Sequence, residues 1–332
     1  MMRKGGVDLR ILVLLALVMV SLCVVPLLTS DRYQLKVLTL VGINVITVTG
    51  MALLFGFAGQ VSLGHAAFVG IGAYTSAYVV STLGWPWLIG PVAAVVVAAL
   101  GGFLLALPSL RLRGHYLAMA TLGFGEIMRV VFVEASAVTG GPDGFSGIPY
   151  PSLAGLEIDS PAGNYWLVWG VAVVSMVLSA NLVRSRSGRA MRALHGSESG
   201  AMACGIDVTA VKVRVFVLSA ALAGLAGALH AHVIGFISPA SFSLHVSVLI
   251  VAMAVAGGTR SLVGPALAAT LLTLIPYADA VIPGLSRPLL DAIQAYQEDA
   301  YGLAISAVML FAPAGLAGLL RRAVAVRGWR LA

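Results

Sequence analysis

Charged residues are scarce in this chain: they make up 10% of its 332 residues, whereas hydrophobic residues make up 60%. An average soluble domain is about 25% charged, and a chain of this length could not cover a water-exposed surface with so few charges. The mean hydropathy of +1.00 agrees. The composition therefore predicts an integral membrane protein, and the 38 glycines fit that class because glycine is common in membrane helices.

Motifs that would mark an enzyme are also missing. The only lysines are Lys4, Lys36 and Lys212, and none of them ends a phosphate-binding loop of the form G-x-x-x-x-G-K-[ST]. The six histidines show no metal-type spacing, and no nucleophile elbow G-x-S-x-G occurs. We therefore expect a non-catalytic chain without metal or cofactor. Any ATP hydrolysis that drives it must come from another subunit.

Cysteine is nearly absent as well. Cys23 and Cys204 lie far apart and form neither a redox nor a metal motif.

No A-x-A-like cleavage site follows the first apolar run, so we expect residues 11–29 to form a retained helix rather than a signal peptide. The net charge of +7 is spread over short loops, which indicates membrane orientation rather than nucleic-acid binding.

What the sequence does contain is a series of apolar runs. A span needs about 20 mostly apolar residues, and ten runs qualify or come close: 11–29, 36–55, 62–82, 88–107, 115–134, 165–182, 214–235, 244–258, 261–277 and 301–320. The third is glycine-rich, and the eighth and ninth are short and nearly abutting. These three are candidates for broken or re-entrant helices, which occur only where they face protein or water. The predicted fold is an all-α bundle of about ten transmembrane segments, forming one domain over residues 1–332.

The distribution of positive charge predicts the orientation of that bundle. If the N-terminus is cytoplasmic and each run crosses once, sixteen Lys and Arg residues lie inside and three outside, with Arg129 within a span. Cytoplasmic loops carry such an excess of positive charge. Both termini and the basic loop of about 184–214 are then cytoplasmic. A long loop of about 135–164, which contains TGGPDGFSGIP, and an acidic segment, Asp279–Ala300, are then outside.

A glycine-rich stretch, Gly59–Tyr74, places polar side chains within an apolar run. Gln60, Ser62 and His65 follow one another there. Glycine allows close helix packing, so tight packing is one interpretation. The other is a broken helix whose freed backbone groups and polar side chains line a translocation path. The two interpretations are compatible.

Glu126 and Arg129 are three residues apart in a membrane run, and therefore lie on one face of a helix. A charge at mid-membrane costs roughly 2.5–3.5 kcal/mol on insertion scales, so Glu126 should face protein or water. A structural ion pair is one interpretation, and a role in gating or substrate passage is the other. No other span carries a matching carboxylate, which disfavours a proton relay.

The most basic segment is RSRSGRAMRALHGSESGAMACGI, which runs from Arg184 to Ile206. It shows no strong apolar face beyond Gly188 and becomes small and nearly neutral after the arginines. One interpretation is a short helix along the membrane surface. The other is a segment whose small residues let the cleft of a partner close on it.

Several stretches together resemble the LivM-type permease subunits of ATP-binding-cassette importers for branched-chain amino acids. They are GQVSLGHAAFVGIGAYTSA, RLRGHYLAMATLGFGEIMR, TGGPDGFSGIP, SRSGRAMRALHGSESGAMACGIDVTAVKVRVFVLSAALAGLAGAL, FISPASFS and AGGTRSLVGPALAA. The resemblance implies that the basic loop docks on the cytoplasmic ATPase. The residues it assigns to that coupling contact are Arg189, Arg192, Glu198, Gly200, Ala201 and Gly205.

The same resemblance implies the assembly and the location. It implies two cytoplasmic ATPase subunits, a second homologous permease, and a periplasmic or lipid-anchored substrate-binding protein, all at a bacterial or archaeal cell (inner) membrane. The expected cargo is leucine, isoleucine or valine, although relatives carry urea, short amides or aromatic acids. A stand-alone secondary transporter or channel is the alternative. It would need paired intramembrane carboxylates, and only Glu126 is a candidate.

Overall fold

The computed structural model describes residues 31–109, 112, 114–153, 156–259 and 261–278, and scattered residues between 295 and 318. The predicted first span, the chain termini and most of Asp279–Ala300 lie outside the described residues. The last predicted span, 301–320, is described only in part.

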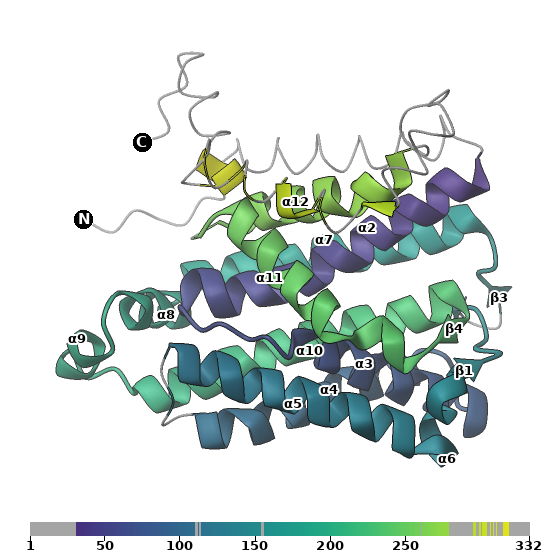
Figure 1. Ribbon diagram of the computed structural model, residues 1–332, viewed down its shortest axis with the longest axis horizontal. Coiled ribbons are helices and arrows are strands. Elements are labelled where there is room, and N and C mark those ends of the chain that lie inside the picture. The colour runs from purple at the N-terminus through teal and green to yellow at the C-terminus, as the bar shows by residue number, and fades with distance from the viewer. Residues whose placement is uncertain are drawn as a thin grey trace, which may run out of the picture.

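The described part of the chain is almost entirely helical (Figure 1). The long helices are α2 (Arg32–Met51), α3 (His65–Ala77), α4 (Ile89–Ser109), α5 (His115–Glu134), α7 (Pro161–Arg184), α10 (Val208–Ile234), α11 (Leu244–Gly257) and α12 (Val263–Leu274). Short helices are α6 (Ser136–Thr139), α8 (Arg186–Gly196) and α9 (Glu198–Ala203). The π-helical turns η1 (Ala52–Phe57) and η2 (Tyr78–Thr82) continue α2 and α3, and 3-10 turns η3 (Gly141–Asp143), η4 (Pro239–Phe242) and η5 (Ile275–Tyr277) lie between elements.

Six helical stretches of the described residues are long and apolar enough to cross a membrane: Arg32–Phe57, Ile89–Pro108, His115–Glu134, Pro161–Arg184, Val208–Ile234 and Pro239–Gly257. The prediction of an all-helical membrane protein is confirmed, but the count of about ten spans is not. The glycine-rich third run is helical only from His65, and Val263–Tyr277 is a shorter apolar helix. The eighth run is long enough once η4 is included.

Capping residues explain why two spans begin earlier than their apolar runs. The side chain of Ser160 accepts a hydrogen bond from the Gly163 backbone and Pro161 follows it, so α7 begins there rather than at 165. The side chain of Asp207 caps α10 by accepting a hydrogen bond from the Ala210 backbone N–H. Helix α10 therefore begins with a polar turn before the apolar run at 214. Gly235, with φ of 77°, ends α10 in the left-handed conformation that glycine adopts without strain.

Helix α3 is the centre of the bundle. It is buried on all sides, with α10 and α4 packed closely against it (Figure 1). Two glycines allow α3 and α10 to approach. A methyl group added to Gly72 would overlap the Gly224 backbone, and one added to Gly227 would overlap the Val69 carbonyl oxygen. The tight packing predicted from the glycines is therefore present in this pair of helices.

We expect Gly72→Ala to lower the free energy of unfolding by about 2–3 kcal/mol, because the new methyl group forces the α3 and α10 backbones apart. The measurement is thermal unfolding of the purified protein in mild detergent. Gly123→Ala on α5 is the matched control, since nothing lies within 4 Å of its added methyl group. Equal midpoints for the two variants would contradict the packing argument.

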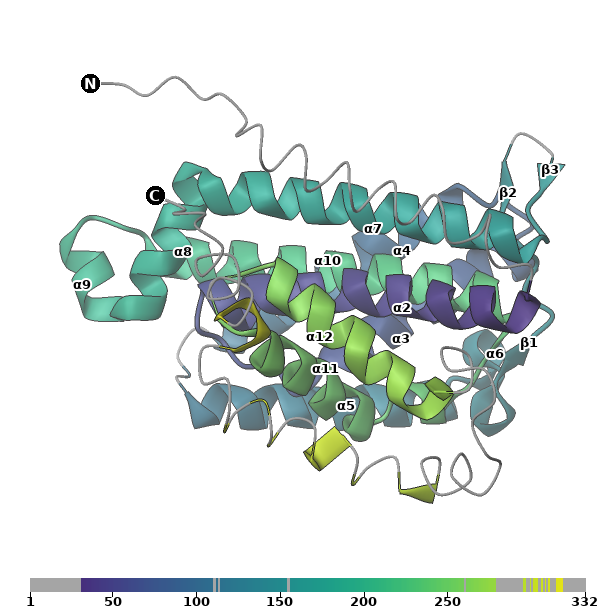
Figure 2. The ribbon, with the colours of Figure 1, turned by 90° about the horizontal axis from the view of Figure 1, so that it is seen from above.

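The loops gather at two opposite ends of the bundle (Figure 2). One end carries α8 and α9. The other carries two short antiparallel ladders, in which β1 (Phe145–Ser146) pairs with β4 (Phe236–Ile237) and β2 (Ser152–Leu153) pairs with β3 (Leu156–Glu157). His232 adds a second link at that end, because its Nδ1 lies 2.8 Å from the Pro149 carbonyl oxygen. The ladder joins the predicted loop of 135–164 to the loop after α10.

Candidate coupling and translocation site

The basic segment folds into two consecutive helices, α8 and α9. Ser185 caps α8 by accepting a hydrogen bond from Ser187, and Ser197 caps α9 by accepting one from Gly200. The prediction that this segment lacks an apolar face is wrong for α8, because Met191 and Leu194 are buried in the core. Gly188, Met191 and Leu194 are three residues apart and therefore lie on one side of α8. The arginines between them hide this apolar pattern in the sequence.

Helix α9 projects beyond the rest of the described chain in both views (Figures 1 and 2). Gly200 and Gly205 are exposed there, whereas Ala201 is buried against its own chain. Gly205 has φ of 72°, so it turns the chain from α9 toward α10. The tip also exposes half of the Met202 side chain (51%), an apolar residue that the sequence analysis did not single out.

Glu198 is held by an ion pair within the chain. Its Oε1 lies 2.5 Å from Nζ of Lys212 on α10, and the Lys212 side chain is only 7% exposed. A lysine this deeply buried requires a partner charge. The pair fixes the start of α9 to α10. Lys212 was missed in the sequence, where its one signal was a lone lysine just before an apolar run.

The two predicted arginines bind backbone near the end of α7. Arg192 Nη1 donates to the Val183 carbonyl oxygen at 2.8 Å, and Arg189 Nη1 lies 3.5 Å from the Ser185 carbonyl oxygen. A cation at a helix C-terminus satisfies free carbonyl groups and opposes the helix dipole. Arg192 therefore joins α8 to α7, and both arginines are exposed to solvent or a partner.

The segment Ala58–Gly64 between η1 and α3 is not helical, so the glycine-rich region is interrupted as expected for a broken helix. Leu63 N–H donates to Thr121 Oγ1 on α5 (2.9 Å), and Ala66 N–H donates to Ser247 Oγ on α11 (3.0 Å). Polar side chains from two neighbouring helices thus satisfy backbone groups that the break leaves free, which is the condition for irregular backbone at membrane depth.

A cavity of about 340 Å³ brings two predicted sites together. Gln60 from the break lines it, and so do His195 and Glu198 from the coupling segment and Lys212 from α10. Gln60 is buried and its Oε1 has no hydrogen-bond partner among the described residues. Gly59 has φ of 70° and faces the His195 ring so closely that an added methyl group would lie 2.9 Å from Nδ1. The break and the coupling segment are therefore in direct contact.

Ser62 and His65 lie away from this cavity, fully buried in the core. Ser62 Oγ has no partner within the described residues, and the His65 ring packs edge-on to Phe68 with centroids 6.2 Å apart. The structure therefore brings Gln60, but not its two neighbours, to the coupling segment.

Glu126 and Arg129 form the predicted ion pair, with Arg129 Nε 2.8 Å from Glu126 Oε2. The pair is on the outward face of α5: the side chains are 40% and 47% exposed, and Ile127 and Val130 beside them are exposed as well. The pair belongs to a surface of the single chain and not to the cavity at Gln60.

No group of three or more His, Cys, Asp or Glu side chains that could hold a metal ion occurs among the described residues. The geometry instead supplies a projecting helix, an internal ion pair and a broken helix in contact with one another, which is suited to transmitting motion rather than to bond chemistry.

Comparison with known proteins agrees with this architecture. Residues 33–320 match the family described as branched-chain amino acid transport system / permease component. The chain is 35% identical over 320 residues to the high-affinity branched-chain amino acid transport system permease protein LivM of Salmonella typhimurium and to that of Escherichia coli, covering 89% of this chain and 72% of each relative. It is 26% identical over 277 residues to the autoinducer 2 import system permease protein LsrC of Yersinia enterocolitica, covering 82% of this chain and 66% of that relative.

No solved structure matches the chain. The family match spans every long helix of the described part, from α2 to α12, and includes the broken segment and the coupling segment. The resemblance to the LivM-type permeases is thereby confirmed, and this chain belongs to the family of permease components of branched-chain amino acid transport systems.

Proposed function

We propose that this chain is the membrane subunit through which an ATP-driven importer moves branched-chain amino acids into the cell. Family membership and the names of the LivM relatives support the cargo. The observation that carries the mechanism is the contact between His195, at the end of α8, and Gly59 in the break, beside a cavity that Gln60 and Glu198 of α9 both line. A displacement of α9 and of the adjoining α8 therefore reaches the interior of the bundle through that contact. Urea, short amides and aromatic acids remain the alternative cargoes.

The assembly we propose contains two cytoplasmic ATP-binding-cassette ATPase subunits, a second homologous permease and a periplasmic or lipid-anchored substrate-binding protein. The end of the bundle with α8 and α9 faces the cytoplasm, together with both termini, and the ladder end faces outward. The ends of three apolar runs that the charge pattern places at the inner face support this orientation, because Phe57, Arg184 and Ser261 line one small cavity. The chain works in a bacterial or archaeal cell membrane and needs no cofactor of its own.

The proposed mechanism is alternating access. Closure of the ATPase pair displaces α9, and the ion pair between Glu198 and Lys212 transmits the displacement to α10. Contact between His195 and Gly59 transmits it to the break before α3. Because α3 and α10 pack backbone against backbone at Gly72 and Gly224, the two helices move as one body.

Reconstitution tests the proposed function. We expect extraction at low salt to recover the chain with an ATPase and a second permease, identified by mass spectrometry. In liposomes with the binding protein and ATP, the complex should take up leucine, isoleucine or valine. A chain that purifies alone and supports flux without ATP would establish the stand-alone transporter instead.

The ion pair on α5 gives a separate prediction. Glu126→Gln leaves Arg129 without its counter-charge on an apolar exposed face, where the pair must meet water or a second permease. We expect uptake to fall about tenfold, while the unfolding midpoint of the isolated chain changes by less than about 2 °C, because exposed pairs contribute little stability. Ile127→Leu is the control on the same face. A large loss of stability with unchanged specific uptake would assign the pair a purely structural role.

A further inference from the structure

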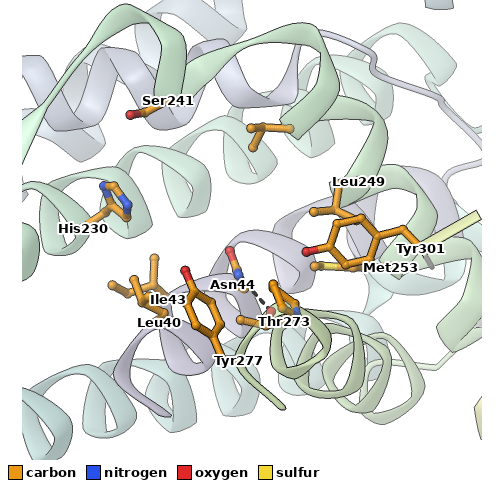
Figure 3. A pocket seen from close by; sticks show the side chains of 12 residues that line it. Leu40, Ile43, Asn44, His230, Ser241, Leu249, Met253, Thr273, Tyr277 and Tyr301 are labelled. Atoms are coloured by element: carbon orange, nitrogen blue, oxygen red, sulfur yellow. Dashed lines mark hydrogen bonds between the residues drawn. The ribbon is translucent and has the colours of Figure 1, made fainter. Parts of the chain in front are cut away.

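Two arginines from separate helices line a cavity of about 280 Å³ between α8 and α10. Arg186 and Ser187 belong to the start of α8, and Asp207 and Arg214 belong to the start of α10. The rest of the wall is apolar and consists of Ala190, Met191, Ile206, Ala210 and Val211. Charge distinguishes this space from the larger cavity of about 540 Å³ between α2, α10, α11 and α12 (Figure 3), whose described lining residues include no Asp, Glu, Lys or Arg.

The two arginines of this cavity are not neutralised within the described chain. Arg189 and Arg192 of α8 donate to backbone carbonyl oxygens. The guanidinium groups of Arg186 and Arg214, in contrast, are exposed and make no hydrogen bond or ion pair with another described residue. Of the acidic residues outside the described part, only Asp8 belongs to a segment that the charge pattern places on the inner side. Two guanidinium groups are therefore available to an anion from outside the chain.

The cavity lies at the level where two membrane spans end. The span Pro161–Arg184 ends two residues before Arg186, and the span Val208–Ile234 contains no Asp, Glu, Lys or Arg after Arg214. Leu218, one helical turn beyond Arg214 and on the same face of α10, is exposed and faces away from the core. An anion between the two arginines therefore lies at the depth of the lipid headgroups, and an apolar chain attached to it can run along Leu218.

The chemistry of the lining suits a phosphate group with a single negative charge. Arginine binds phosphate oxygens with two parallel N–H groups, and the Ser187 hydroxyl adds a neutral donor. Asp207 repels an anion, but its Oδ1 accepts a hydrogen bond from the Ala210 N–H at 3.0 Å, which ties its charge to the start of α10. With two arginines and one aspartate, the lining keeps one net positive charge. Basic pockets between membrane helices on the cytoplasmic side are typical sites for anionic lipid headgroups.

We propose that the cavity between α8 and α10 binds the headgroup of an anionic phospholipid from the inner leaflet. Arg186 and Arg214 bind the phosphate oxygens, Ser187 donates a further hydrogen bond, and the acyl chains lie against Leu218. The bound lipid joins α8 to α10 at the membrane surface. This site goes beyond the proposed function, and only the choice of leaflet rests on the orientation proposed above.

Three probes test the lipid site: dioleoylphosphatidylglycerol, which is anionic, dioleoylphosphatidylcholine, which has the same chains on a zwitterionic headgroup, and glycerol 1-phosphate, which has no chains. Native mass spectrometry of the full chain in mild detergent measures binding apart from transport. We expect phosphatidylglycerol to bind about fivefold or more tightly than phosphatidylcholine, and glycerol 1-phosphate not to saturate at the same concentrations. Equal affinity for the two lipids would overturn the proposal.

Two other results would also overturn it. Saturable binding of glycerol 1-phosphate as tight as that of phosphatidylglycerol would show that a free phosphate compound is the ligand. Repeating the titration on the chain assembled with its ATPase gives the second test, because a lipid bound at the membrane surface should remain bound. Loss of the phosphatidylglycerol site on assembly would show that an acidic segment of the ATPase occupies the cavity instead.

Variants that remove one charge then place the bound headgroup. Arg186→Gln and Arg214→Gln should each weaken phosphatidylglycerol binding about fivefold, without lowering the unfolding midpoint, because both side chains are exposed and bind no other described residue. Arg184→Gln is the matched control, since Arg184 is an exposed arginine two residues away that lines a different cavity. It should change the affinity by less than about twofold. An equal loss in the control would show diffuse attraction to the basic segment and would contradict the assignment.

Asp207→Asn should tighten phosphatidylglycerol binding about two- to fivefold, because it removes the one negative charge of the lining. Asparagine caps a helix as well as aspartate does, so α10 should still begin at the same residue. A misfolded protein would not bind more tightly, and a gain of affinity therefore reports on the cavity itself. Unchanged affinity in Asp207→Asn would show that the headgroup lies outside this cavity.

Discussion

Replacing Met202 with aspartate is expected to reduce ATP-driven uptake at least tenfold without lowering the amount of folded protein in the membrane. Met202 is half exposed on α9, which projects beyond the rest of the described chain, so its side chain contributes little to stability within its own chain. Burying a methionine in a partner groove contributes roughly 1.5–3 kcal/mol. A charge there removes that contribution and adds a desolvation cost. The measurement is leucine uptake by proteoliposomes together with co-purification of the ATPase.

Met202→Leu is the matched control, because it keeps an apolar side chain of similar volume and should retain most of the uptake. Uptake that survives Met202→Asp, with the ATPase still bound, would show that the projecting helix does not dock through its tip. The alternative in which this segment lies on the membrane surface would then gain support, since an exposed methionine would face lipid headgroups instead.

The second large effect concerns the ion pair between Glu198 and Lys212. Glu198→Gln should lower the free energy of unfolding by about 2–3 kcal/mol, because Lys212, with 7% of its side chain exposed, is left as an uncompensated charge. Glu198 itself is 23% exposed, so the loss is smaller than for a fully buried pair. Thermal unfolding in detergent and uptake in proteoliposomes are the two measurements. Uptake should fall with stability, because α9 loses its attachment to α10.

The double variant Glu198→Gln with Lys212→Met separates the two roles of Glu198. Replacing a buried pair with well-packed uncharged side chains is often neutral for stability, so we expect the unfolding midpoint to recover. If Glu198 acts only through Lys212, uptake recovers with it. A stable double variant without uptake would instead place Glu198 in direct contact with the ATPase, as the family resemblance implies. A double variant as unstable as the single one would contradict the pairing.

Helix boundaries show where sequence reasoning was sufficient. The run at 115–134 coincides with α5, because both ends of that apolar run are also the ends of the helix. The runs at 165–182 and 214–235 were too short at their starts, where Ser160 and Asp207 begin each helix with polar turns that hydropathy does not register. For the glycine-rich run, the sequence indicated a break but not its position, which depends on hydrogen bonds from Thr121 and Ser247.

The site residues likewise include some whose contacts could be predicted from the sequence and others whose contacts could not. Glu126 and Arg129 could be paired from their spacing, because residues three apart on a helix are neighbours. The partner of Glu198 could not be predicted, because Lys212 is on another helix and reaches it only when α9 folds back toward α10. The burial of Ala201 and the exposure of Met202 likewise follow from how α9 packs, since a six-residue helix has too few positions for a periodic pattern.

The sequence by itself determined that this is a helical membrane protein without signatures of catalysis, and the family to which it belongs. Composition and ordered motifs are sufficient for both, because the bilayer admits few structures and the motifs extend over most of the chain. Only the tertiary structure decided that Gln60 lines one cavity with the coupling segment and that Lys212 is the partner of Glu198. Each of these depends on contacts between residues far apart in the chain, which no local pattern specifies.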